Sequence, residues 1–241
     1  GRYKYLEKMR EIFFRNHQGT SISFDRYVRF YKWIDSSMNE MIEQLFPCPI
    51  GFYFLDRNIT NKEMSYLKNL PMEKNTGNLN SCNGKVLSDK SMNSLNKFIR
   101  ISLANFCEET FNFDADKITL KITHSWTNRT KQGEHHHKHS HPNSIISGVF
   151  YFDCNDNDGV QFYDNKNWLG LDKLLVPSKN FNPFNSGSCS FSVKVGELLL
   201  FPSQLEHAVH TVQGKKDRYS ISFNTFYKGA LGNDNANKLI L

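Results

Sequence analysis

The sequence contains no Cys-x-x-Cys pair and no long run of apolar residues. Its five cysteines are an odd number and lie far apart, which argues against a disulfide framework and against a cysteine-based zinc site. An intracellular, reducing compartment is therefore favoured. A membrane-spanning helix needs about 18 or more consecutive apolar residues, so the chain has no such helix and no membrane partner is expected.

Acidic residues are also in short supply. The chain has 24 Asp and Glu against 30 Lys and Arg, which gives a formal net charge of +6 and an isoelectric point near 9.0. This excess permits an acidic partner without requiring one. No basic stripe with interleaved aromatic residues is present, so a protein or a small molecule is favoured over nucleic acid as the substrate. Hydrophobic residues make up 39% of the chain, which is enough for a packed core.

The first 46 residues predict a helical appendage. Apolar side chains recur there at steps of three and four, which makes one helix face apolar. The clearest stripe comprises Tyr27, Phe30, Tyr31, Ile34, Met38, Met41 and Leu45. Pro47 and Pro49 then mark a boundary, so residues 1–46 and 47–241 are predicted as an appendage and a main domain. The stripe packs against the main domain in one interpretation and binds an assembly partner in the other.

Between this boundary and residue 115 the chain predicts few regular elements. Residues 51–55 are a strand candidate and residues 61–70 a helix. Residues 71–86 are rich in Asn, Gly and Ser and predict a loop. Ser88 is a candidate cap for a second helix over residues 92–106, where apolar positions step by three and four.

After residue 115 short β-prone runs alternate with Asn, Asp, Gly and Pro. These runs are 118–126, 144–152, 160–163, 190–195, 197–202, 207–212 and 219–227. Such a series is typical of an all-β sandwich or barrel rather than a βαβ array. The sequence therefore predicts a mainly β fold with flanking helices (α+β), built on a sandwich or jelly roll.

The histidines are concentrated in two places. The segment 133–144 holds His135, His136, His137, His139 and His141, and a later segment holds His207 and His210. Residues i and i+2 of a strand point to the same face, so His139 and His141 can aim two imidazoles into one barrel mouth. His207 would add a third ligand and leave open positions, which suits iron rather than structural zinc. The first three histidines are interpreted as a solvated surface patch that binds metal opportunistically, or simply as a basic loop.

Arg218 follows His207 by eleven residues and shares its strand face with Ser220. A buried arginine binds a carboxylate through two parallel hydrogen bonds, and a neighbouring hydroxyl adds a third. A keto-diacid that chelates a metal through its other end needs such a pocket. Tyr151 is a weaker candidate for the same pocket, since a core tyrosine is an equally good interpretation.

A set of ordered motifs resembles the 2-oxoglutarate and iron(II)-dependent oxygenases. The set comprises Asn128, Gly133, His139-Ser-His141-Pro-Asn, Ser147-Gly-Val-Phe-Tyr151, Gly196-Glu-Leu-Leu-Leu-Phe-Pro-Ser203, His207 and Arg218-Tyr-Ser-Ile-Ser-Phe-Asn224. The sequence is particularly similar to a group with a His-x-His-Pro-Asn motif that is common in phage and marine bacterial genomes. The resemblance implies a double-stranded β-helix, also called a distorted jelly roll. It also implies Fe(II) and 2-oxoglutarate as cofactors, with ascorbate as a candidate reductant, and hydroxylation of a substrate with release of succinate and CO2.

One position departs from the wider superfamily, which uses His-x-Asp or His-x-Glu followed by a distal His. Here His141 occupies the carboxylate position. Three neutral imidazoles leave the metal with one negative charge fewer, which weakens electron donation and raises the reduction potential. Asp153, Asp164 and Glu206 are candidate substitute carboxylates. Glu206 precedes His207, so it should face the opposite way on a strand.

Two other functions remain open. The first is a cupin-type metal protein that does not use 2-oxoglutarate. Gly133, His139 and His141 fit the opening of the cupin motif, but the glutamate expected shortly afterwards is absent, and Arg218 has no role in that reading. The second is a structural or interaction subunit that keeps a degenerate metal site.

Overall fold

The computed structural model describes residues 46–164, 179–182, 184–232 and 237–241. The predicted helical appendage, residues 1–46, lies outside the described residues apart from Phe46. The appendage and its boundary at residue 47 therefore stay predictions, as does a role for this segment in binding an assembly partner. Residues 48–241 form one compact unit.

Strands dominate this unit. They are β1 Gly51–Phe54, β2 Met72–Lys74, β3 Leu79–Ser81, β4 Ile118–Thr130, β5 His136–His139, β6 Ile146–Asp153, β7 Gly159–Tyr163, β8 Ser188–Ser192, β9 Glu197–Pro202, β10 His207–Val209, β11 Arg218–Leu231 and β12 Leu239–Ile240. The α-helices are α3 Asn61–Lys68 and α4 Asn93–Phe111, and two 3-10 turns, η1 Val86–Ser88 and η2 Lys90–Met92, precede α4. The prediction of a mainly β fold with flanking helices is confirmed.

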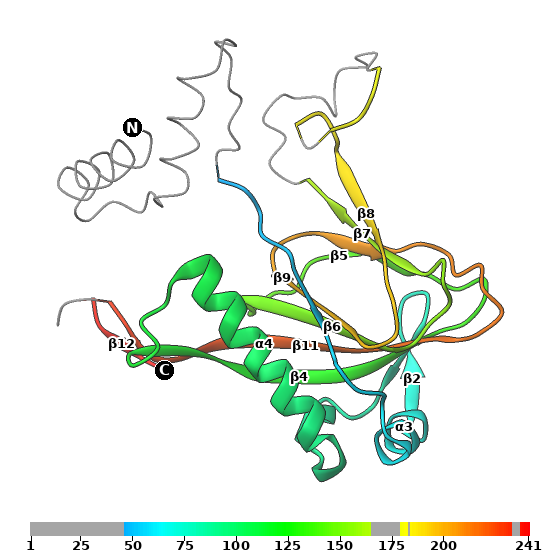
Figure 1. Cartoon of the computed structure of the whole chain (residues 1–241), viewed down its shortest axis with the longest axis horizontal. Helices are drawn as coiled ribbons and strands as arrows, with labels where there is room; N and C mark the ends of the chain where they lie inside the picture. Colours follow the sequence, from blue (N-terminus) through cyan, green and yellow to red (C-terminus); the bar gives the residue numbers. More distant parts are fainter. Residues whose placement is uncertain (1–45, 165–178, 183, 233–236) are drawn as a thin grey trace, which may run out of the picture. The chain divides into compact units, whose positions relative to one another are not determined.

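The strands form two antiparallel sheets. The larger has the order β1-β9-β6-β11-β4-β3-β2, with β12 paired to the end of β11. The smaller has the order β5-β10-β7-β8. In Figure 1 the long pair β4 and β11 runs through the middle of the larger sheet, with α4 lying across it. Apart from β2 with β3 and β11 with β12, strands that are neighbours in space are distant in sequence, so each sheet joins residues from several parts of the chain.

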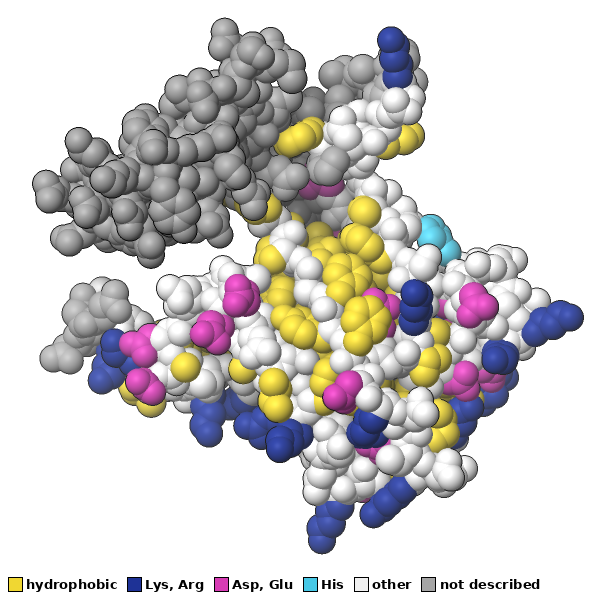
Figure 2. All heavy atoms as spheres, in the orientation of Figure 1, with side chains coloured by type: hydrophobic (Ala, Val, Ile, Leu, Met, Phe, Trp, Pro, Cys, Tyr) yellow, Lys and Arg dark blue, Asp and Glu magenta, His cyan; other side chains and the backbone are white. Residues whose placement is uncertain are grey.

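The surface in Figure 2 carries no continuous basic patch among the described residues of the face shown. Lys and Arg side chains are interspersed with Asp and Glu around a central group of hydrophobic side chains. In the part of the chain that the structure describes, no helix is long and apolar enough to cross a membrane. Cys82, Cys107, Cys154 and Cys189 form no disulfide in the structure.

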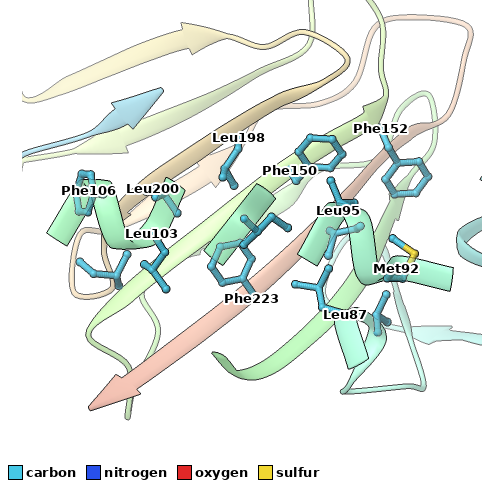
Figure 3. Close-up of a cluster of buried hydrophobic side chains, with 14 of the residues drawn as sticks. Leu87, Met92, Leu95, Leu103, Phe106, Phe150, Phe152, Leu198, Leu200 and Phe223 are labelled. Atoms are coloured by element: carbon cyan, nitrogen blue, oxygen red, sulfur yellow. The ribbon is translucent and has the colours of Figure 1, made fainter. Parts of the chain in front are cut away.

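Neighbouring residues of a strand point to opposite sides, so the larger sheet contributes side chains to two separate cores. One face packs against α4. It contributes Phe150, Phe152, Leu198, Leu200, Ile221 and Phe223 to a core that also contains Leu95, Ile99 and Leu103 of the helix (Figure 3). The other face packs against the smaller sheet through Tyr151, Leu199, Phe201, Val160 and Phe162. Strand residues that follow the register of Tyr151 therefore face the space between the sheets.

Two local predictions were wrong. Residues 71–86 were expected to form a loop, but they contain the hairpin of β2 and β3. Backbone pairing of Leu79 and Asn80 with β4 stabilises these short polar strands. The hairpin therefore forms although its side chains have a low propensity for strands. Ser88 lies in η1 and does not cap the second helix, which begins at Asn93 after η2.

Candidate metal centre

Strand pairing brings His139 and His207 together from distant parts of the chain. The two residues are directly opposite each other in the antiparallel pair β5 and β10, and their ring centroids lie 4.4 Å apart. His207 is 5% exposed and packs against the ring of Phe201 at 4.8 Å. A hydrophobic wall of this kind limits the access of water to the imidazole.

His141 reaches the same point without belonging to the strand. β5 ends at His139, and the backbone N–H of His141 donates a hydrogen bond to the carbonyl of Ser203 at 2.9 Å. Its ring lies 5.0 Å from that of His139 and 5.1 Å from that of His207. One ring nitrogen from each histidine lies within 4.8 Å of the other two. The structure therefore brings together all three histidines that the sequence proposes as ligands, although strand alternation is not the reason for His141.

Hydrogen bonds fix the tautomer of two of these rings. Nδ1 of His139 lies 2.8 Å from the carbonyl of His137, and Nδ1 of His207 lies 3.0 Å from the carbonyl of Leu205. Because a carbonyl only accepts, each Nδ1 must carry the proton. The lone pair of each neutral ring is then on Nε2, which is free to bind a metal.

The rings are also held neutral. Burial lowers the pKa of His141 to about 3, with His207 and His139 adding to the effect. Burial likewise lowers the pKa of His207 to about 4 and lowers the pKa of His139. Neutral imidazole is the form that coordinates a metal, so the chain presents this form at neutral pH.

Arg218 lies at the start of β11, between the sheets, and is 3% exposed. Its guanidinium lies 5.0 Å from the centroid of the Tyr151 ring. Neither Nε of Arg218 nor the hydroxyl of Tyr151 has a hydrogen-bond partner among the described residues, although both atoms are fully buried. Buried polar atoms are nearly always paired, so these two indicate the place of a polar ligand.

A polar strip on the same sheet face continues this pocket. Ser220 lies opposite Tyr151 on one side and Asn128 on the other. The Asn128 amide donates a hydrogen bond to Ser222 at 2.8 Å and lies 3.5 Å from the Ser220 hydroxyl. The structure thus places Arg218, Ser220 and Tyr151 around one buried polar region. Together these side chains offer enough hydrogen-bond donors to bind a carboxylate.

Two of the three carboxylates considered as substitutes for His141 form ion pairs with lysines. Glu206 forms an ion pair with Lys138 at 2.8 Å, and Asp153 forms one with Lys68 at 2.6 Å. Among the described residues, the groups with metal-ligand spacing consist of histidines alone. The donor set is therefore three neutral imidazoles, which fits a divalent transition metal with open positions.

One residue of this region escaped the sequence analysis, which interpreted His136 as part of a surface patch. Between the pairs His207–His139 and Val209–His136, β5 advances by one residue more than β10, which is a β-bulge. The bulge turns His136 to the side of His139, and their rings stack at 4.4 Å. Burial lowers the pKa of His136 to about 3, and the charges of its histidine neighbours and Arg218 contribute. No sequence signal marks a bulge of this kind.

Two adjoining open hollows, with volumes of about 530 and 390 Å³, lie on the larger sheet, and none of His139, His141 and His207 lines them. Both are lined by His124 and Asn224, and we name them together the sheet groove. Its remaining lining residues are Lys121, Thr123, Pro142, Asn143, Phe226, Glu73, Asn80, Ser81, Cys82, Gly84 and Trp126. The ring of Trp126 lies 5.8 Å from that of His141, so the sheet groove leads up to the histidine cluster.

Residues 124–224 match a family model described as "Putative 2OG-Fe(II) oxygenase". The matched segment contains the three clustered histidines, Arg218 and Tyr151. It bears out the resemblance seen in the sequence at the level of the family, whose members use Fe(II) and 2-oxoglutarate. No curated protein matches the chain.

The solved structures add a likeness of fold. The non-heme alpha-ketoglutarate-dependent epimerase SnoN from nogalamycin biosynthesis matches with a TM-score of 0.50 at 10% identity, over 76% of this chain and 80% of that one. An oxidoreductase of the 2OG-Fe(II) oxygenase family from Burkholderia pseudomallei matches with a TM-score of 0.48 at 15% identity, over 67% and 74% of the two chains. HygX from Streptomyces hygroscopicus, solved with nickel and 2-oxoglutarate, gives 0.48 at 11% identity, over 73% and 82%. The prediction of a double-stranded β-helix is confirmed by the two-sheet topology and the SnoN likeness.

Proposed function

We propose that this chain, a 2OG-Fe(II) oxygenase-family enzyme by its match over residues 124–224, binds Fe(II) through His139, His141 and His207. We further propose that 2-oxoglutarate binds beside the metal, anchored by Arg218 with Ser220 and Tyr151. The observation that carries both proposals is the combination of three converging neutral imidazoles with a buried guanidinium nitrogen that has no partner.

Each residue of the proposed site would have a defined role. His139 and His207 would offer their Nε2 lone pairs to the metal and His141 a third ring nitrogen, and three protein ligands would leave coordination positions for the cosubstrate and oxygen. Arg218 and the Ser220 hydroxyl neutralise and orient the far carboxylate, and the Tyr151 hydroxyl donates a further hydrogen bond. Phe201 and Phe162 surround His207 and exclude water. When bound, Fe(II) and 2-oxoglutarate supply the oxidation of a substrate C–H bond, with release of succinate and CO2.

The pocket at Arg218 favours this proposal over a cupin-type metal protein that does not use 2-oxoglutarate. Burying a guanidinium with an unpaired Nε costs free energy unless a ligand satisfies it. A keto-diacid has a carboxylate to place there, whereas a cupin reaction without a cosubstrate does not. The finer resemblance to the phage and marine bacterial group with the His-x-His-Pro-Asn motif is part of this proposal.

The sheet groove supports a substrate that approaches along the larger sheet. It is open to solvent and passes from Lys121 and Phe226 to Trp126, next to the proposed ligand His141. Its mixed polar and aromatic lining suits a protein segment or a small polar molecule. Lys121 is the only basic side chain that lines it among the described residues, which does not favour a nucleic-acid backbone.

Anaerobic titration of the protein with Fe(II) and then 2-oxoglutarate tests the proposal. We expect the weak visible charge-transfer band of the iron–2-oxoglutarate chelate to appear at one equivalent of each. The variant His207→Ala should lose the band and the iron. Exposure to air should then give succinate from the wild-type protein, with ascorbate, the candidate reductant, extending turnover.

Two outcomes would contradict the proposal in different ways. Iron bound without any chelate band, at saturating 2-oxoglutarate, would return the chain to the cupin-type alternative. A chelate band without succinate, across a panel of candidate protein and small-molecule substrates, would favour a binding or structural subunit with a degenerate metal site.

A further inference from the structure

We propose that His136, His137 and His139 form a second metal site, the outer site, which shares His139 with the three-histidine cluster described above, here called the inner site. The three residues have ring nitrogens that all lie within 4.8 Å of one another. The two sets differ in location: the inner site lies between the sheets, and the outer site lies on β5 at the surface.

The rings of the outer site are spaced like those of the inner site. Their centroids are separated by 4.4 Å between His136 and His139, 5.0 Å between His137 and His139, and 5.2 Å between His136 and His137. Neighbouring residues of a regular strand point to opposite faces, so three histidines within four positions would not converge. The β-bulge in β5 removes this obstacle, because it turns His136 toward His139.

His139 cannot serve both sites at once. Its Nδ1 donates a hydrogen bond to the carbonyl of His137, which leaves Nε2 as the one nitrogen with a free lone pair. A metal in the outer site therefore removes a ligand from the inner site. The two sites are alternatives, and this exclusion, unlike the outer site itself, rests on the role proposed above for His139.

Accessibility and chemistry indicate which metals the outer site takes. His137 is exposed, whereas His136 and His139 are partly buried and His207 is buried. A metal ion from solvent therefore meets the outer set first. Imidazole ligands suit Zn²⁺, Ni²⁺ and Cu²⁺, and each of these ions binds nitrogen donors more tightly than Fe²⁺ does. The outer site is thus a place where such an ion withdraws His139 from iron.

Asn75 contacts a proposed ligand of this site in the metal-free chain. Its side-chain amide nitrogen lies 3.3 Å from Nε2 of His136, and the same nitrogen lies 2.9 Å from the side-chain oxygen of Asn78. The nearby carbonyl of Thr76 lies 3.4 Å from Nδ1 of His137, which directs the lone pair of that ring to Nε2. A metal that binds His136 through Nε2 must displace Asn75, so Asn75→Ala should strengthen binding at the outer site.

Zinc stoichiometry in an inner-site variant tests the outer site directly. The full-length chain is titrated with Zn²⁺ against a chromophoric chelator, without iron or 2-oxoglutarate. The wild-type protein should bind one ion. His207→Ala should still bind one, through the outer site, and His137→Ala with His207→Ala should bind at least tenfold more weakly. His135→Ala with His207→Ala is the matched control, because His135 is an exposed histidine of the same segment that belongs to neither set.

Each other result overturns part of the proposal. The outer site is absent if His207→Ala binds no zinc, or if adding His137→Ala leaves its zinc affinity unchanged. Exclusion is wrong if the wild-type protein binds two ions of comparable affinity. Should His207→Ala fail to fold by circular dichroism, His207→Gln replaces it. Since these measurements contain neither iron nor 2-oxoglutarate, their failure leaves the chelate test of the proposed oxygenase unaffected.

Discussion

His207 lies directly opposite His139 across the pairing of β10 with β5, and their ring centroids are 4.4 Å apart. The two residues are separated by most of the length of the β-rich part of the chain. Each donates its Nδ1 proton to a backbone carbonyl, so both present the same nitrogen, Nε2. The backbone thus orients two rings of the proposed iron site without the help of further side chains.

The buried arginine of the pocket provides the first prediction. Arg218→Ala should weaken 2-oxoglutarate binding about tenfold to a hundredfold while leaving iron affinity unchanged, because charge-assisted hydrogen bonds to a carboxylate contribute roughly 1.5–3 kcal/mol. Titration of the chelate band measures this loss. Arg129→Ala is the matched control. Arg129 pairs with Asp217 at 2.6 Å on the opposite sheet face, so its removal should leave the chelate unchanged. Equal loss in both variants would refute the pocket.

The unpartnered tyrosine provides the second. Tyr151→Phe removes a buried hydroxyl that has no partner in the ligand-free chain, so the free energy of unfolding should stay the same or rise by about 1 kcal/mol. The same variant should bind 2-oxoglutarate more weakly. Tyr66→Phe is the control, because its hydroxyl accepts a hydrogen bond from Asn83 and its loss should destabilise the protein. Urea denaturation with and without 2-oxoglutarate distinguishes these effects. A destabilised Tyr151→Phe with normal cosubstrate affinity would remove Tyr151 from the pocket.

The third prediction uses Trp126 as a fluorescent probe of metal binding at the inner site. Its ring lies 5.8 Å from that of His141, so a paramagnetic ion such as Ni²⁺ bound there should quench its fluorescence. Trp126→Phe should abolish most of the metal-dependent change without altering metal affinity in a competition assay. His207→Ala, which leaves the indole in place, should reduce the change, because the ion no longer binds at the inner site. Quenching that persists in Trp126→Phe would mean that the ion binds elsewhere.

The position of the missing carboxylate provides a fourth prediction. His141→Asp restores the His-x-Asp arrangement of the wider superfamily and adds a negative charge beside the metal. The variant should retain iron and have a lower reduction potential than the wild-type site, because an anionic ligand stabilises the ferric ion. Spectroelectrochemistry of the iron-loaded protein measures the shift. His124→Asp, beside Trp126 but outside the ligand set, should change the potential little. An unchanged potential in His141→Asp would exclude residue 141 as a ligand.

Local sequence patterns determined much of the fold. Alternating short runs after residue 115 predicted the strands that became β4, β6, β7, β9 and β11, and the spacing of apolar residues predicted α4. These elements depend on hydrophobic periodicity, which can be recognised within a short stretch of sequence. The ordered histidine and arginine motifs likewise indicated the oxygenase family that residues 124–224 match. The helical appendage lies outside the described residues and remains a prediction.

Other features were decided by contacts between distant segments. The hairpin of β2 and β3 forms because it pairs with β4, and no local propensity announces it. His141 was expected to follow strand alternation, yet a hydrogen bond to Ser203 positions it beyond the end of β5. His136 was interpreted as surface, but a mismatch in register with β10 turns it inward.

The sequence by itself therefore determined which donors the protein has and which fold carries them: three candidate imidazoles, one arginine and a mainly β chain. Only the tertiary structure decided that these donors converge and that the Arg218 Nε and the Tyr151 hydroxyl have no hydrogen-bond partner among the described residues. The physical reason is that convergence and burial depend on strand register and on the packing of two sheets, which join residues as far apart in the chain as Gly51 and Leu200. A linear pattern holds no record of such distances.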